Sequence, residues 1–205
     1  MTRLVAVFLS TVASSSLLGC ALTSKSDPTL LRYYSMGSPL PRTRGSSAAS
    51  ASTKPAQARL RIGRVSAALY IRERMAFRES DLEIGYYDDF RWTERPESYV
   101  RRDLARALFE DEGVGETVGG GGLTLDVDLE RFEEVRQTRL GVVQLSWQLR
   151  DETVVLLRQT VHVQRPLAAS ENSSPHKALA AALSEALEEA IDQIVNAVLP
   201  KLAAL

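Results

Sequence analysis

The segment "LTLDVDLERFEEVRQTRLGVVQLSWQLRDETVVLLRQTVHVQRP", residues 123–166, carries the clearest strand pattern in the chain. Residues 123–130 place Leu or Val at every odd position and Thr, Asp or Glu at every even one, and residues 143–150 repeat this alternation. Such a period predicts strands with one face in the core and one face in water. Asp151 and Glu152 then predict a tight turn into a third strand. Three consecutive strands joined by short turns predict an antiparallel meander.

A long amphipathic helix is predicted after the meander. Ser174 can cap its start and Pro175 suits its first turn, whereas Pro200 is expected to end or kink it. Its polar face carries several carboxylates, which anionic lipid would repel, so we expect the apolar stripe to pack on the sheet rather than on a membrane. The stripe consists of Leu179, Leu183, Leu187, Ile191, Ile194, Val198 and Leu202.

The residues that precede the meander predict further strands and one helix. A Ser-, Ala-, Gly- and Pro-rich composition separates the first strand from the rest, and such a segment buries too little apolar area to offset the entropy of ordering it. The expected elements are a strand in 31–36, a loop over 37–57, a strand over 58–68, an extended region over 75–92 with a turn at 79–81, and a helix that starts at Pro96 and ends before Gly113.

The N-terminus has the layout of a secretory signal, with Arg3 followed by a short apolar run and then small residues. The run is too short for a spanning helix, which needs about 20 apolar residues. Leu17-Leu18-Gly19-Cys20 resembles the bacterial lipobox, in which cleavage between Gly and Cys is followed by acylation of the thiol. The alternative for Cys20 is a free buried thiol or an intermolecular disulfide.

Acylation of Cys20 would anchor the mature protein in a membrane, and the rest of the chain would fold without any thiol. The next residue is Ala21, whereas Asp at this place commonly retains lipoproteins in the inner membrane. We therefore expect an outer-membrane lipoprotein that faces the periplasm. The expected organisation is a signal peptide over 1–19, a lipidated tether over 20–30 and one domain over 31–205.

Composition and side-chain inventory argue against several functions. Lys and Arg number 25 against 26 Asp and Glu, so no basic excess draws the chain to nucleic acid. The two histidines, His162 and His176, have no neighbours at metal-ligand spacing. Asp88-Asp89 is predicted to be a turn, and Asp126 with Asp128 the wet face of a strand. We expect no catalytic residues, no metal and no cofactor, and an envelope hydrolase is disfavoured.

Residues 70–110 carry a more specific signal, because aromatic and Arg positions stand before a Pro-led helix. This region resembles the ABC-type transport auxiliary lipoprotein family, the PqiC-like proteins. The order of the later strands and the terminal helix extend the resemblance from about Leu31 to the C-terminus. The departures are the loop before residue 58 and the four consecutive glycines, Gly119 to Gly122. The positions that match are Tyr33-Tyr34, Phe77-Arg78, Tyr86-Tyr87, Arg91-Trp92, Pro96 and Leu104 to Leu108.

The resemblance implies an α/β (α+β) fold, a three-layer domain with a mixed, largely antiparallel sheet and two main helices, similar to the N-terminal domain of TolB. It also implies a non-enzymatic docking role. The expected partners are a periplasmic MCE-domain protein and its ABC or PqiA-like membrane partner, in an envelope system that moves lipid. A homo-oligomer is compatible with ring-shaped partners.

Three residues are expected to shape or brace the face that contacts the partner: Arg91, Trp92 and Tyr99. Arg, Trp and Tyr dominate the energetics of protein interfaces. The structural alternative is that Trp92, which leads into a helix, is a core residue. The alternative function is a lipid-carrying envelope lipoprotein with an apolar pocket between the sheet and the last helix.

Overall fold

The computed structural model describes residues 30–37, 59–119, 122–168 and 174–204. The compact unit spans Leu31–Leu205. Apart from Gly37, the predicted loop 37–57 lies outside the described residues, as does Cys20. The strands are β1 (Arg32–Tyr34), β2 (Arg59–Ala67), β3 (Arg74–Ser80), β4 (Glu83–Trp92), β5 (Gly115–Glu116), β6 (Leu123–Val135), β7 (Leu140–Arg150) and β8 (Val155–Pro166), and the helices are α1 (Pro96–Ala105), the π-helix η1 (Arg106–Asp111) and α2 (Pro175–Ala203).

The strand β6 organises a mixed eight-stranded sheet. Along one edge it pairs antiparallel with β7, and β7 pairs antiparallel with β8, which confirms the predicted meander. Its other edge is shared, because β2 runs parallel to its first half and β3 runs parallel to its second half. The remaining strands extend this side: β4 pairs antiparallel with β3, β1 parallel with β4, and β5 parallel with β2.

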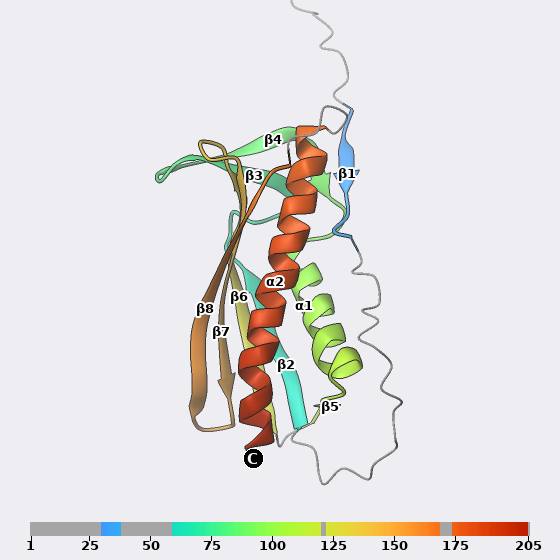
Figure 1. Cartoon of the computed structure of the whole chain (residues 1–205), viewed down its shortest axis with the longest axis vertical. Helices are drawn as coiled ribbons and strands as arrows, with labels where there is room; N and C mark the ends of the chain where they lie inside the picture. Colours follow the sequence, from blue (N-terminus) through green and yellow to red (C-terminus); the bar gives the residue numbers. More distant parts are fainter. Residues whose placement is uncertain (1–29, 38–58, 120–121, 169–173, 205) are drawn as a thin grey trace, which may run out of the picture. The chain divides into compact units, whose positions relative to one another are not determined.

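Both helices pack on the same face of the sheet, α2 across β7 and β8 and α1 across β2, and the two helices contact each other (Figure 1). The described elements therefore form one helical layer on one layer of strands, where the resemblance implied three layers. The α+β class, the mixed sheet and the two main helices agree with the expectation. The apolar stripe of α2 is buried over its whole length, so its predicted packing on the sheet is confirmed.

Close packing between α2 and β7 depends on small residues. A Cβ at Gly141 would approach the Cβ of Ala182 to 3.1 Å, which is tighter than ordinary contact.

The helix α2 continues past Pro200 to Ala203, so Pro200 does not end it. Its missing N–H falls in the last turn, where few further hydrogen bonds are lost.

Three local predictions need correction. Asp88 and Asp89 lie inside β4 rather than in a turn, at a bulge where the register against β3 shifts. The turn between β3 and β4 falls at Asp81 and Leu82, one or two residues later than predicted. Asp126 is buried, because β6 is flanked by strands on both sides and polar side chains from them cover it.

Candidate interaction surface

The first strand, β1, joins the predicted tether to the domain. Its three residues pair in parallel with the end of β4, which sets Tyr34 beside Trp92. The amide of Thr93 donates to the Tyr34 carbonyl (2.9 Å), and the rings of Tyr34 and Phe90 lie 5.9 Å apart. We call this place the tether junction: β1, the end of β4 and the start of α1.

Trp92 and Tyr99 form the buried side of the tether junction, with exposed fractions of 2% and 0%. Their rings meet edge to face with centroids 6.4 Å apart, and Trp92 also packs on Phe132 at 5.2 Å. The Tyr99 hydroxyl bonds with Thr93 Oγ1 (2.8 Å) and accepts from the Glu94 amide (3.2 Å). In this structure the two rings offer no surface to a partner, so only the bracing role that the sequence suggested remains open to them.

Arg91 is half-buried at the same junction. Its Nη1 donates to the carbonyls of Tyr87 (3.1 Å) and Phe90 (3.0 Å), so the guanidinium ties together the bulged part of β4. The structure therefore brings all three predicted residues to one place. Two of them belong to the core, and the third holds the backbone of its own strand.

An aromatic cluster, formed by Tyr34, Tyr87, Phe90 and His176, connects the tether junction to the start of α2. The imidazole of His176 stacks on Phe90 at 3.5 Å between centroids and meets Tyr87 edge to face at 4.7 Å. Burial lowers the pKa of His176 below its ordinary value. Burial, together with the hydrogen bond to Glu134, raises the pKa of Tyr87 to about 12. No sequence pattern predicts this cluster, because Tyr34 and His176 lie far along the chain from the two rings of β4.

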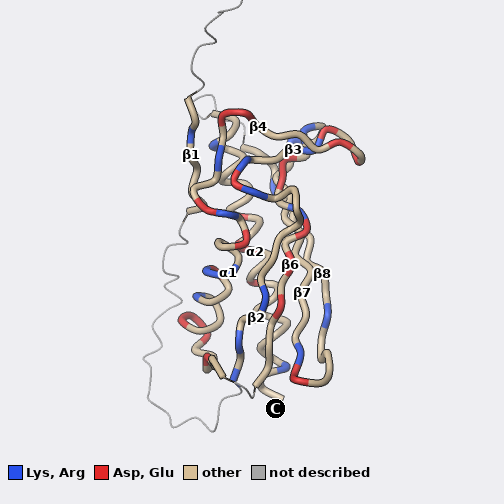
Figure 2. Tube along the Cα trace, turned by 180° about the vertical axis from the view of Figure 1, so that it is seen from behind, with Lys and Arg blue, Asp and Glu red and all other residues tan. Residues whose placement is uncertain are grey.

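The face of the sheet that carries no helix is polar, and we call it the polar face. Figure 2 shows basic positions along β2 beside acidic positions along β6. Asp126 accepts from the amide of Arg64 (2.8 Å), from Arg150 Nε (2.9 Å) and from Gln148 Nε2 (3.3 Å). Although burial opposes ionisation, these hydrogen bonds outweigh it, so the pKa of Asp126 lies below its usual range.

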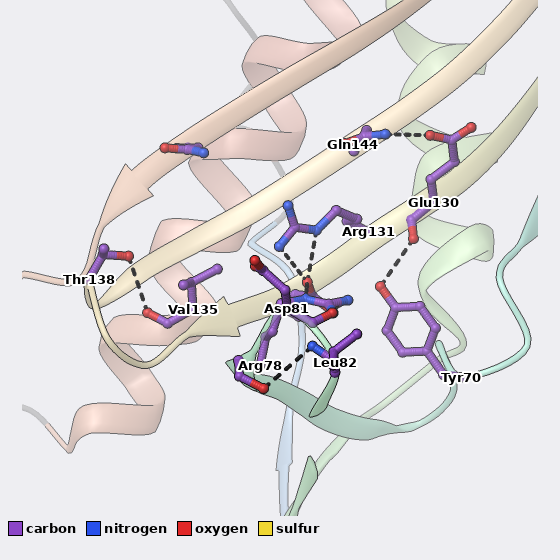
Figure 3. Close-up of polar contacts among 12 residues, drawn as sticks. Tyr70, Arg78, Asp81, Leu82, Glu130, Arg131, Val135, Thr138 and Gln144 are labelled. Atoms are coloured by element: carbon purple, nitrogen blue, oxygen red, sulfur yellow. Dashed lines mark hydrogen bonds and ion pairs between the residues drawn. The ribbon is translucent and has the colours of Figure 1, made fainter. Parts of the chain in front are cut away.

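The most deeply buried charge in the polar face is Glu133, with no exposed surface. Its carboxylate accepts from Arg78 Nε (2.6 Å) and from Arg131 Nε (2.8 Å), and Figure 3 shows both arginines in this cluster. Burial alone would raise the pKa of Glu133, but the two arginines hold it below its ordinary value. Arg78 lies on β3 and Arg131 on β6, so the cluster locks the β3–β4 hairpin onto the long strand.

Side-chain hydrogen bonds continue across the polar face to β8. The Tyr70 hydroxyl donates to the Glu130 carbonyl (3.0 Å), and Gln144 Nε2 donates to the Glu130 carboxylate (Figure 3). Gln144 Oε1 in turn lies 3.1 Å from His162 Nδ1. His162 is exposed, as its position in the strand predicted. The polar face is thus cross-linked laterally over β6, β7 and β8.

We searched the described part of the chain for side chains that could hold a metal ion and for a groove that could hold a ligand. No group of three or more His, Cys, Asp or Glu side chains there could hold a metal ion. A groove of about 230 Å³ lies between η1 and α2, and it is lined by Ala107, Glu110, Asp111, Glu112, Asp192, Val195 and Asn196. Its carboxylates suit an acyl chain poorly.

Comparison with known families identifies the family of the chain. The model of a family described as ABC-type transport auxiliary lipoprotein component matches residues 40–195. None of the curated proteins compared with the chain is similar enough to count as a match. Among the described helices, none has the length and apolar character to cross a membrane.

Solved structures share the fold. A Xanthomonas campestris protein of the DUF330 family is 24% identical, with a TM-score of 0.59 over 69% of this chain and 86% of that one. An uncharacterized protein is 14% identical, with a TM-score of 0.62 over 82% of this chain and 99% of that one. A hypothetical protein from Chlamydia trachomatis is 7% identical, with a TM-score of 0.50 over 73% of this chain and all of that one. At these identities the likeness concerns the fold alone.

Proposed function

Since the chain belongs to the family of ABC-type transport auxiliary lipoprotein components, we propose that it is a non-enzymatic docking lipoprotein of an envelope system that transports lipid. Its partners would be a periplasmic MCE-domain protein and the ABC or PqiA-like membrane component of that system. The observation that carries this proposal is the extent of the family match, which covers most of the described domain from β2 into α2.

The proposed anchor is an acylated Cys20, produced by cleavage after the Leu17-Leu18-Gly19 sequence. One acyl chain binds membranes only marginally, whereas several chains anchor a protein stably. Ala21 favours the outer membrane, with the domain in the periplasm. The tether then runs from Cys20 to Leu31, eleven residues along the sequence, or at most about 40 Å when fully extended.

Within this proposal Arg91, Trp92 and Tyr99 act as bracing residues. They hold β1 to β4 and α1, so the strand that follows the tether is fixed to the core of the domain. A variant with Arg91→Ala and Tyr99→Phe should weaken partner binding while leaving most of the apolar core in place. Unchanged binding in that variant would remove these residues from the interaction.

The alternative of a lipid carrier has less support. The stripe of α2 packs directly against β7 and β8, and its central residues Leu183, Leu187 and Ile194 are at most 1% exposed. The same stripe that suggested a pocket is therefore explained by packing. Native mass spectrometry of the domain without its anchor would test the alternative, since a carrier should retain phospholipid.

The main experiment is crosslinking of the full-length, lipidated protein in its own cells, followed by purification from solubilised outer membrane and identification of what is bound. We expect an MCE-domain protein, with or without its permease. The matched control carries residues 21–205 behind a signal for soluble export, which should leave the membrane fraction. Recovery of phospholipid and no transport component would contradict the docking role, and an adduct of twice the chain's mass would identify a homo-oligomer.

A further inference from the structure

The strand β8 is a long edge strand. It pairs with β7 along its whole length, from Arg150 opposite Val155 to Leu140 opposite Pro166, and no other strand of the described chain pairs with it. Figure 1 shows it at the margin of the sheet. An edge of this kind presents a row of backbone N–H and C=O groups that another extended chain can bind.

The direction of these backbone groups follows from one hydrogen bond. The Leu167 amide donates to the Arg139 carbonyl (3.0 Å), which lies directly opposite it at the end of the ladder. Opposite residues in an antiparallel pair alternate between hydrogen-bonded and non-hydrogen-bonded pairs. Val161 and Val163 therefore bond to β7, whereas Thr160 and His162 direct their N–H and C=O groups to the outer edge.

Most of the edge is exposed. Along β8 only Val161 and Val163 are buried, and the strand begins beside three exposed apolar residues, Val154 (56%), Val155 (43%) and Leu156 (39%). At the other end Pro166 closes the strand, and Arg165 Nη1 donates to the Gln164 carbonyl (3.3 Å), one of the outward acceptors. The open part of the edge is therefore Val155–Val163, and its first two residues are exposed and apolar.

The charges of β8 indicate what can bind. The strand contains Arg158, His162 and Arg165 and no acidic residue. Arg165 pairs with Glu189 of α2, whereas Arg158 Nη2 donates to the neutral side chain of Gln148 (2.7 Å). Two β8 strands side by side would form no ion pair in any register, because neither brings a carboxylate. A strand with acidic residues complements this edge better than a second copy does.

We propose that the outer edge of β8 is the docking site for an extended segment of the partner protein, with acidic side chains toward Arg158 and apolar side chains toward Val155 and Leu156. The inference rests on the proposed function for the identity of the protein that supplies the segment. Backbone hydrogen bonds to Thr160 and His162 would set its register. Strand addition of this kind uses the sheet without opening the core.

The central test is Thr160→Pro in the full-length, lipidated chain. Proline removes an outward N–H and puts its ring in the path of an added strand, but it spares the ladder to β7. The matched control is Thr160→Ala, which keeps the N–H. We expect at least a tenfold loss of the co-purified transport component with Thr160→Pro and none with Thr160→Ala, at equal thermal stability.

Two further variants test association at β8 if Thr160→Pro disturbs folding. Arg158→Glu should weaken association about tenfold through charge repulsion, whereas Arg72→Glu, on an exposed loop position, should not. A photo-crosslinking residue at Gln159 should give an adduct with the transport component, mapped to an acidic peptide, and one at Glu185 on α2 should give none.

The outcomes distinguish the β8 site from the docking function. If the wild-type chain recovers a transport component and Thr160→Pro recovers it equally well, the β8 site is wrong and the docking function stands. An adduct at Gln159 that consists of two copies of this chain would also overturn the proposed occupant. If the wild-type chain recovers no transport component at all, the proposed function fails, and the β8 proposal fails with it.

Discussion

Asp126 illustrates how single residues shape the polar face. Its carboxylate is buried and accepts from β2 and β7, and the amide of Arg64 can reach it because Gly63 leaves the space open. A Cβ at Gly63 would overlap Asp126 Oδ1 and the methyl group of Thr124. Gly63 lies at the bulge where the register of β2 against β6 shifts.

Gly63→Ala should lower the free energy of unfolding by about 1–3 kcal/mol, because the new methyl group displaces a buried, hydrogen-bonded carboxylate. Gly115→Ala is the control, since its Cβ would meet Arg59 Cγ at 3.9 Å, an ordinary contact. Urea denaturation followed by circular dichroism measures both. Equal stability of the two variants would show that Asp126 moves aside without cost.

Glu133→Gln tests the buried charge cluster and its pH dependence. Loss of the carboxylate leaves Arg78 and Arg131 without their common negative charge, which should cost about 3 kcal/mol at pH 7. The folded-state pKa of Glu133 is lowered from 4.5, so its stabilisation is present above that pH and is lost as the pH falls through the lowered value.

The stability difference between wild type and Glu133→Gln should therefore shrink between pH 7 and pH 3 in urea titrations. The control is Asp88→Asn, whose ion pair with Arg74 involves an Asp88 side chain that is 88% exposed. Exposed pairs contribute little, so this variant should stay close to wild type at both pH values. A constant difference for Glu133→Gln across the pH range would contradict the assignment.

At the scale of the element, the tether junction shows how a three-residue strand is held. β1 has few ladder bonds of its own, and it depends on Trp92 and Tyr99 behind it. The helix that follows starts as predicted at Pro96, but its second half is the π-helix η1. Hydrophobic periodicity in the sequence does not distinguish an α-helix from a π-helix over so few residues, because the side-chain patterns of the two are similar within one turn.

Tyr99→Phe should loosen the junction without changing the core. The ring remains, but the hydroxyl that bonds with Thr93 and accepts from the Glu94 amide is lost, at a cost of about 1 kcal/mol. Hydrogen exchange of the Thr93 amide, which donates to Tyr34, should become faster. Tyr33→Phe, at a 62% exposed position, should leave that exchange unchanged. Identical protection in the two variants would argue against the bracing role.

At the scale of the whole molecule, His176 connects elements from both ends of the chain. It lies in the first turn of α2, stacks on Phe90 of β4 and meets Tyr87 of β4 edge to face, and Phe90 in turn contacts Tyr34 of β1. The charged groups that act on it are Glu134, Arg32, Asp89 and Arg136, after burial, which is the largest influence. Its protonation state therefore bears on how α2, β4 and β1 hold together.

His176 should make stability fall on mild acidification. Its folded-state pKa is lowered from 6.5, so the unfolded chain binds the proton first and stability is lost as the pH falls from 6.5 through the lowered value. His176→Phe keeps the stack and should reduce the drop in Tm between pH 7.5 and pH 5.5. His162→Gln, at an exposed position, should retain it. A drop that survives in His176→Phe would place its origin elsewhere.

The strand meander, the last helix and the buried stripe of α2 could be predicted from the amino-acid sequence alone, because hydrophobic periodicity reflects local geometry and does not depend on distant partners. It also carried the family pattern, and it predicts an anchor at Cys20. Which strands pair with β6 depends on tertiary contacts, since two parallel strands can divide one edge of it without any local signal in the sequence. The same contacts buried Asp126, Glu133, Trp92 and Tyr99. Burial of a polar or aromatic side chain depends on the elements that cover it, and those come from distant parts of the chain.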